Sequence, residues 1–265
     1  MRELKRMRDD GRAHAERAGG AWWQRVVAGA LAFTYAVLWA GGAGHYLFVG
    51  AVAAEQSWLA SAFLAVAGAI VLFTTTSRRE LMLLVAVGAF GLLVELCGVY
   101  YDWPFGQYAY TSVLRPVVSG VPVVMACAWL TLVAYVRQGI LRADLSPLTG
   151  ALVAAAWMTA IDLVIDPLAA NQLGYWRWAR PGAYYGIPLS NFAGWFAASL
   201  AIFALLGGRA RRANIWHRLT GASIIMFFTL IALSFRLWAA ALIGFLLCAS
   251  DVLLYATRRR RRHER

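Results

Sequence analysis

The stretch LMLLVAVGAFGLLVELCGVYYDWPFGQYAY, residues 81–110, decides the class of fold. Its first 21 residues carry one charged side chain, that of Glu95, among apolar and small residues. An α-helix needs about 20 predominantly apolar residues to cross the hydrocarbon core of a bilayer. Residues 81–101 therefore predict a membrane-spanning helix. The Gly and aromatic residues that follow predict a loop at one membrane surface.

The whole chain has the composition of a membrane protein. Of its 265 residues, 61% are hydrophobic and 14% are charged, and the mean hydropathy is +0.60. Soluble domains average about 45–50% apolar and about 25% charged residues. The composition therefore excludes an ordinary cytosolic enzyme and a disordered chain.

The predicted fold is an all-α polytopic bundle of about eight transmembrane helices. Each span is a segment long and apolar enough to cross the hydrocarbon core. The eight segments are residues 26–43, 58–75, 81–101, 116–136, 148–169, 186–206, 219–235 and 237–257.

The basic residues alternate between the two sides of this predicted bundle. Of the 25 Lys and Arg residues, 21 lie before the first span, after the last span or in every second connection. The other four lie in the remaining connections, at Arg115, Arg177, Arg180 and Arg236. Cytoplasmic segments carry an excess of Lys and Arg. The pattern predicts a multi-pass protein of the cell membrane with both termini in the cytoplasm.

Three parts are predicted along the chain: a basic cytoplasmic arm at residues 1–25, a single transmembrane domain at 26–257 and a basic tail at 258–265. The motif-rich core of the domain is residues 81–206. The net charge of +12 does not indicate a nucleic-acid partner, because the charges lie between apolar segments. The expected contact is membrane lipid. The three cysteines lack metal-ligand spacing, and we predict no metal site.

Two stretches of the core resemble each other, which predicts a parallel repeat of spans three–four and five–six. Each copy has a Gly followed by alternate aromatic residues, then Gly-hydrophobic-Pro, then a Trp seven residues after the proline. These features lie at Gly106, Tyr108, Tyr110, Gly120, Pro122 and Trp129 in one copy, and at Gly174, Trp176, Trp178, Gly186, Pro188 and Trp195 in the other. Functional sites of membrane proteins built from repeats often lie at the repeat interface.

The carboxylates in and near the predicted spans are the residues that most indicate a chemical function. Asp162 and Asp166 are four residues apart and share a helix face, as do Glu95 and Asp102, seven apart. Ionisable groups inside a membrane are costly and by default suggest function. A desolvated carboxyl can remain protonated and act as a general acid. The alternative to a catalytic role is a structural one, in which these acids form salt bridges with the four arginines on the same side of the membrane.

The aromatic residues between the fifth and sixth spans are denser than an interfacial belt requires. They include Trp176, Trp178 and Tyr185. Such a cluster can stabilise a cation by its ring faces or form the lid of a lipid-filled cavity.

Four motifs together resemble the membrane carotenoid biosynthesis family, which includes carotenoid 1,2-hydratases and bisanhydrobacterioruberin hydratases. They are YDWPFGQY at residues 101–108, DLVIDP at 162–167, GYWRW at 174–178 and YGIPLSNFAGW at 185–195. The resemblance covers residues 81–206 and implies addition of water to the terminal 1,2 double bond of an acyclic C40 or C50 carotenoid. It implies no cofactor, and other carotenoid biosynthesis enzymes as possible partners.

Hydration of a trisubstituted alkene needs a proton donor, a pocket that tolerates a tertiary carbocation and a positioned water. We expect Glu95 or Asp162 to donate the proton, and Asp166 and Asp102 to orient the water. The expected substrate-binding residues are Tyr108, Trp176, Trp178, Tyr185 and Trp195, with Asn191 as polar support.

Two other functions fit parts of the sequence. Asp162 and Asp166 have the spacing of one magnesium-diphosphate motif of intramembrane prenyltransferases, although the companion motif is missing. A proton-coupled carrier of lipids or small molecules is the second alternative, since it also uses repeats and buried acids.

Overall fold

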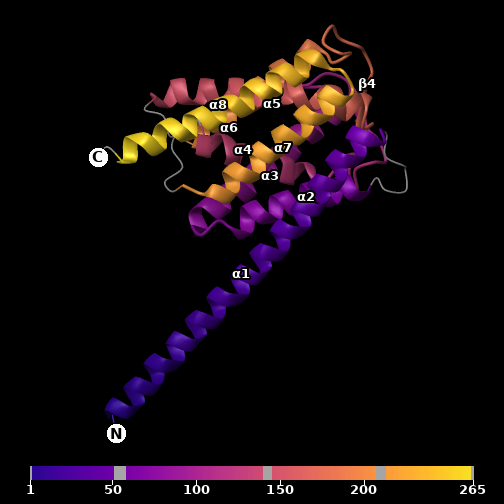
Figure 1. Ribbon diagram of the computed structural model, residues 1–265. Helices are drawn as coiled ribbons and strands as arrows, with labels where there is room; N and C mark the ends of the chain where they lie inside the picture. The colour runs from indigo at the N-terminus through magenta and orange to yellow at the C-terminus, as the bar shows by residue number, and fades with distance from the viewer. Residues whose placement is uncertain (1, 51–57, 140–144, 207–212, 264–265) are drawn as a thin grey trace.

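The computed structural model describes residues 2–50, 58–139, 145–206 and 213–263. In this part of the chain eight α-helices form a bundle, with four short strands at one end of it (Figure 1). The helices are α1 (Arg2–Phe48), α2 (Trp58–Phe73), α3 (Arg78–Tyr101), α4 (Met125–Gly139), α5 (Pro147–Asn171), α6 (Leu189–Leu206), α7 (Ile215–Ser234) and α8 (Trp238–His263). The strands are β1 (Tyr108–Tyr110), β2 (Val117–Val118), β3 (Val121–Pro122) and β4 (Trp176–Trp178).

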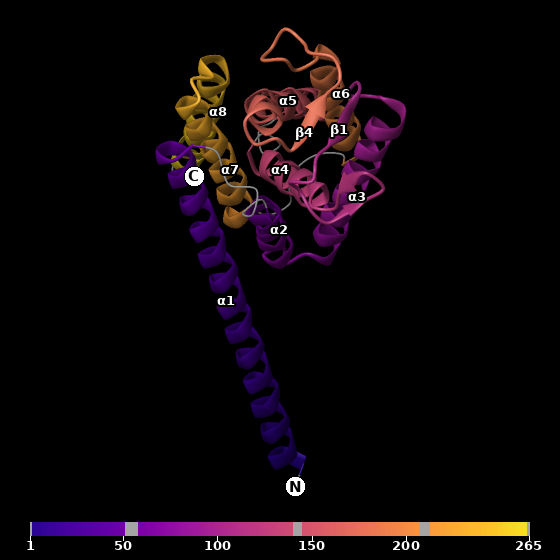
Figure 2. The ribbon, with the colours of Figure 1, turned by 90° about the vertical axis from the view of Figure 1, so that its right-hand side faces the viewer.

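This architecture confirms the all-α polytopic membrane fold. Among the described residues, six helices are long and apolar enough to cross a membrane, and α1 contributes its residues from Trp22 to Phe48. The N-terminal part of α1 extends away from the bundle as one continuous helix (Figures 1 and 2). The start of α1 and the end of α8 lie on the side of the bundle opposite β4 (Figure 1).

Two of the eight helices are shorter than a full span. Helix α2 has 16 residues and α4 has 15. At 1.5 Å per residue, α4 rises about 22 Å, less than the roughly 30 Å of the hydrocarbon core. Helix α4 packs against α2, α3, α5, α7 and α8, and most of its residues are buried. A helix enclosed by others in this way does not need to reach both membrane surfaces.

The predicted starts of spans four and six are wrong, for one physical reason. Residues 116–124 and 186–188 are apolar but do not begin a helix. In each copy a hairpin turn with two central residues at positive φ precedes the helix. These residues are Ser119 (51°) and Gly120 (81°) before α4, and Tyr185 (49°) and Gly186 (81°) before α6. Val118 pairs with Val121, and Tyr184 with Ile187, across these turns. Positive φ at both positions is the signature of a tight hairpin and is incompatible with a right-handed helix.

Strands β1 and β4 join the two copies of the repeat. They pair antiparallel, with Tyr108 opposite Trp178, Ala109 opposite Arg177 and Tyr110 opposite Trp176. Ala109 and Arg177 hold the same place in their copies, three residues after Gly106 and Gly174. The pairing therefore relates the copies by an approximate two-fold axis through this point. We call the end of the bundle that carries β1 and β4 the strand end.

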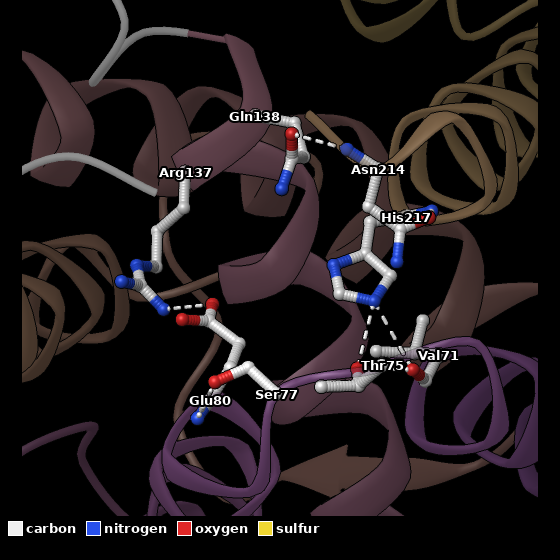
Figure 3. Close-up of polar contacts among 8 residues, drawn as sticks. All are labelled: Val71, Thr75, Ser77, Glu80, Arg137, Gln138, Asn214 and His217. Atoms are coloured by element: carbon white, nitrogen blue, oxygen red, sulfur yellow. Dashed lines mark hydrogen bonds and ion pairs between the residues drawn. The ribbon is translucent and has the colours of Figure 1, made fainter. Parts of the chain in front are cut away.

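A polar cluster connects four helices at the opposite end of the bundle (Figure 3). Asn214 caps α7, accepting from the backbone N–H of Trp216 and His217, and its side-chain amide donates to the Thr74 carbonyl. The Nε2 atom of His217 lies 3.0 Å from Thr75 Oγ1. Arg137 of α4, 3% exposed, forms an ion pair with Glu80 in the first turn of α3.

We expect Glu80→Gln to lower the free energy of unfolding by about 3 kcal/mol. The substitution leaves the buried Arg137 guanidinium without its counter-charge, and breaking one partner of a buried ion pair costs about 3–5 kcal/mol. Denaturant unfolding in detergent measures the loss. Arg79→Ala is the matched control, because Arg79 is adjacent and exposed, and it should change the value by less than about 0.5 kcal/mol. Equal values for the two variants would contradict the prediction.

Candidate active site

Glu95 is buried in α3 near the strand end and accepts three hydrogen bonds. The hydroxyls of Tyr108 and Tyr110 donate to its Oε2 at 2.6 and 2.8 Å, and Trp129 Nε1 donates to its Oε1 at 3.1 Å. The carboxyl is 4% exposed, and three donors compensate for the loss of water around it. All three donors belong to the same copy of the repeat.

Glycines on the same face of α3 make room for these donors. Gly91 and Gly98 lie one turn to either side of Glu95. A Cβ at Gly91 would lie 2.3 Å from Trp129 Cγ, and one at Gly98 would lie 2.7 Å from the Tyr108 hydroxyl. Any larger residue would therefore displace a donor from Glu95.

The two tyrosines act as donors over the whole physiological pH range. Burial raises the pKa of Tyr108, and the nearby Glu95 carboxylate raises it further; the same causes raise the pKa of Tyr110 well above its ordinary value. Both hydroxyls therefore keep their protons and continue to donate to Glu95.

The second centre is formed by Asp162 and Asp166 on α5. The two carboxyls are 3% and 1% exposed. The side-chain amide nitrogen of Asn191 donates to Asp162 Oδ2 at 2.7 Å and to Asp166 Oδ2 at 2.6 Å. Trp176 Nε1 donates to Asp166 Oδ1 at 2.7 Å. The four-residue spacing places the carboxyls on one face of α5, and one amide bridges them.

Helix α5 is adapted to this centre by Pro167, which follows Asp166 directly. Proline lacks the N–H that would bond the carbonyl four residues earlier, at Leu163. The hydroxyl of Tyr184 donates to that carbonyl at 3.0 Å instead. Burial raises the pKa of Tyr184 to about 12, so the hydroxyl remains a donor near neutral pH. Tyr184 thus keeps the backbone satisfied next to the carboxyl pair.

An apolar cavity of about 60 Å³ opens beside Asp162. Asp162 is the one carboxyl among the residues that line it, and the rest of the wall is apolar or aromatic. Trp176 and Trp195 contribute indole rings, and Tyr175 a phenol. The other lining residues are Leu64, Leu114, Met125, Ala128, Leu132, Ile165, Ile224 and Phe228. The cavity therefore combines one acid with a hydrocarbon-like pocket.

Aromatic rings connect the two centres across the repeat axis. Trp129 and Trp195, at equivalent places in the two copies, stack with ring centroids 4.3 Å apart and planes 9° from parallel. Tyr110 meets Trp176 edge-on at 5.8 Å. Tyr108 lies 5.1 Å from Trp178. Glu95 and the Asp162–Asp166 pair thus share one aromatic layer.

The structure brings most of the predicted site residues together, but not all of them. Glu95, Tyr108 and Trp178 lie in the aromatic layer, and Asp162, Asp166, Asn191, Trp176 and Trp195 form or adjoin the cavity centre. Among the described residues, indole, amide and phenol donors bind the carboxyls of Glu95, Asp162 and Asp166, rather than the arginines of the structural alternative.

Two predicted residues lie apart from the centres. Asp102 is exposed at the C-cap of α3, where its φ of 57° and its bond to the Gly98 carbonyl end the helix. The Tyr185 hydroxyl accepts from the backbone N–H of Ala239 at the start of α8 and does not line the cavity. The seven-residue spacing from Glu95 fails for Asp102 because the helix ends before it.

The list of predicted site residues omits three important ones: Tyr110, Trp129 and Tyr175. The repeat was the available signal for two of them. Tyr110 is equivalent to Trp178, and Trp129 to Trp195, and the sequence predicts Trp178 and Trp195 as site residues. Tyr175 lies between chosen positions in the aromatic cluster. The equivalence of the two copies therefore indicates Tyr110 and Trp129 as site residues.

The model of the carotenoid biosynthesis protein family matches residues 56–250, which include both carboxyl centres and the cavity. The chain belongs to this family. Membership confirms the resemblance expected from the four sequence motifs.

The chain is similar to the bisanhydrobacterioruberin hydratase of Haloarcula japonica, with 31% identity over 153 residues. The match covers 56% of this chain and 52% of the relative, so the chain spans about half the length of the relative it matches. No solved structure matches the chain.

Proposed function

We propose that this protein adds water across the terminal C1,2 double bond of an acyclic carotenoid end group, forming a tertiary alcohol. The observation that carries the proposal is the position of Asp162, a carboxyl in the wall of an otherwise apolar and aromatic cavity. An alkene has no polar group to bind, so its pocket must be apolar, and its hydration begins with a strong proton donor. The hydratase relative supports the same reaction class.

The proposed reaction has two steps and balances without another reactant. The Asp162 carboxyl protonates C2, the alkene electron pair forms the new C–H bond, and a tertiary cation remains at C1. Water then attacks C1, and the Asp162 carboxylate accepts the proton that the oxygen loses. The acid is regenerated in each turnover, so the reaction consumes only carotenoid and water. Asn191 and Asp166 hold the Asp162 carboxyl in position.

The depth of the site suits a long substrate. Asp162 lies nine residues before the end of α5, which is about 14 Å along the helix. A polyene of roughly the thickness of the hydrocarbon core can lie across the membrane and place one end near the strand end, where water is close. On the charge pattern, we assign the strand end to the outer side and both termini, with the basic arm and tail, to the cytoplasm.

One observation disfavours the magnesium-dependent prenyltransferase alternative. The Asn191 amide nitrogen donates to both Asp162 and Asp166. A magnesium ion between these carboxylates would need oxygen lone pairs there, not N–H groups. The residues present fit an acid held by an amide better than a metal-diphosphate site.

Pigment analysis tests the proposed function. The chain is expressed in bacteria that accumulate lycopene and, separately, a C50 acyclic carotenoid. We expect products heavier by one water, resolved by chromatography and mass spectrometry. Growth in H₂¹⁸O should label the new hydroxyl.

Two results would refute hydration. One is the absence of a hydrated product from every acyclic carotenoid when the protein is present in the membrane. The other is an unlabelled hydroxyl, which would assign the oxygen to a different source. Magnesium-dependent prenyl transfer or carotenoid transport without chemical change would then support the respective alternative.

A further inference from the structure

Each of the two indole rings in the cavity wall is connected to a buried carboxylate. For Trp176 the connection is direct, because its Nε1 donates to Asp166 Oδ1 at 2.7 Å. For Trp195 it passes through a second ring. Trp195 stacks on Trp129 at 4.3 Å, and Trp129 Nε1 donates to Glu95 Oε1 at 3.1 Å.

Neither Glu95 nor Trp129 lines the cavity. Trp129 is 0% exposed, and Glu95 is enclosed by Trp129 and two tyrosine hydroxyls. A structural role alone would need the hydrogen bonds around Glu95. It would not need the nearly parallel stack of Trp129 on Trp195, a ring of the cavity wall.

We propose that Glu95 and Trp129 are positioning residues that stabilise a carbocation in the cavity by acting through Trp195. This inference rests on the proposed hydration, and it names residues beyond the acid that the reaction uses. The cation lies against Trp195, which stacks on Trp129, and the Glu95 carboxylate lies at the N–H edge of Trp129.

The physical basis is the polarisation of the rings. An indole N–H that donates to a carboxylate shifts electron density toward the ring, and polar contacts polarise one another most in a low-dielectric interior. A more electron-rich ring face attracts a cation more strongly. Because Trp129 and Trp195 stack with an interplanar angle of 9°, the polarised face of one lies directly against the other.

The separation of Glu95 from the cavity also protects the intermediate. A carboxylate in contact with a tertiary cation would remove a proton from it or form an ester with it. Glu95 does not line the cavity and is held at the edge of Trp129, so it does not touch the cation, while its charge still acts at this distance. The arrangement therefore attracts the cation without offering it a second nucleophile.

The test uses a pair of ligands that differ only in charge. The first is an acyclic polyene with a protonated dimethylamino end, in which nitrogen replaces C1 and imitates the cation. The second is its neutral isopropyl isostere. The measured quantity is the ratio of their dissociation constants on purified full-length protein. Wild type should bind the ammonium ligand more tightly than the isostere.

We expect this preference to fall about tenfold in Glu95→Gln and in Trp129→Phe. Both variants should also lower kcat about tenfold with little change in KM, because the interaction forms only when the cation does. The double variant should lose no more than either single one. Trp157→Phe is the matched control, since it removes the indole N–H of another tryptophan in a span that donates to no carboxylate; its preference should equal that of wild type.

The outcomes separate this inference from the proposed function. If wild type hydrates its substrate but the charge preference survives in both variants, the inference is wrong and the hydratase stands. If wild type forms no hydrate, the proposed function is wrong. Should Trp129→Phe fail to fold, Glu95→Gln alone decides, because it keeps the size and shape of the side chain.

Discussion

Asp162→Asn is expected to lower the rate of carotenoid hydration about 10³-fold. A positioned general acid contributes about 10²–10⁴ to a rate, and the amide has no acidic proton to give. Asparagine has nearly the same volume and can still face Asn191, so the bundle should remain folded. Product formed per unit of folded protein in the membrane, compared with wild type, measures the loss.

Asp102→Asn is the control for this experiment. The sequence placed Asp102 with the catalytic acids, but it lies exposed at the C-cap of α3. We expect it to retain hydration within about twofold of wild type. Full activity of Asp162→Asn would remove Asp162 from the reaction. A large loss in Asp102→Asn would show that the exposed carboxyl takes part in it.

Asn191→Leu should have the second large effect, on both stability and activity. Leucine fills a similar volume but removes the one donor that Asp162 and Asp166 share. Leaving a buried acceptor without a partner costs about 1–3 kcal/mol, so we expect about 3 kcal/mol for the two carboxyls together. Misplacement of the acid should lower hydration about 10²-fold. Unfolding in detergent and product analysis measure the two effects.

Asn171 provides a control for the Asn191 substitution. Asn171 ends α5, is exposed, and donates to the Tyr185 carbonyl at 2.7 Å. Asn171→Leu should cost no more than about 1 kcal/mol, because water can replace the lost donor. If Asn191→Leu were as mild as this control, the amide bridge would have no role in holding the acid.

The sequence predicted the helices well because length and apolarity alone decide whether a segment crosses a membrane. It failed at residues 116–124, where the sequence PVVSGVPVV is apolar enough for a span. The hairpin there depends on positive φ at Ser119 and Gly120, and nothing in hydropathy reports backbone conformation. An equivalent turn, at Tyr185 and Gly186, explains why α6 begins later than predicted.

The candidate site was predictable to the extent that its residues are near in sequence. Asp162 and Asp166 lie on one helix turn, and their pairing followed from spacing. Trp129 donates to Glu95 from 34 residues away, and only the fold brings the two together. Asp102 does not share a helix face with Glu95, because α3 ends at Tyr101 and helical spacing does not extend to the next residue.

The elements that supply the hydrogen bonds to each buried acid have a consequence for insertion of the nascent chain into the membrane. Glu95 of α3 takes its donors from β1 and α4, and the α5 acids take theirs from β4 and α6. Asp251 of α8 is bonded by Arg218 of α7.

Each successive helical hairpin thus contains the partners of its own acids. A nascent chain can enter the bilayer two helices at a time without placing an unpartnered carboxylate in lipid. The strand pair and the stacked tryptophans then join hairpins whose acids already have hydrogen-bond partners.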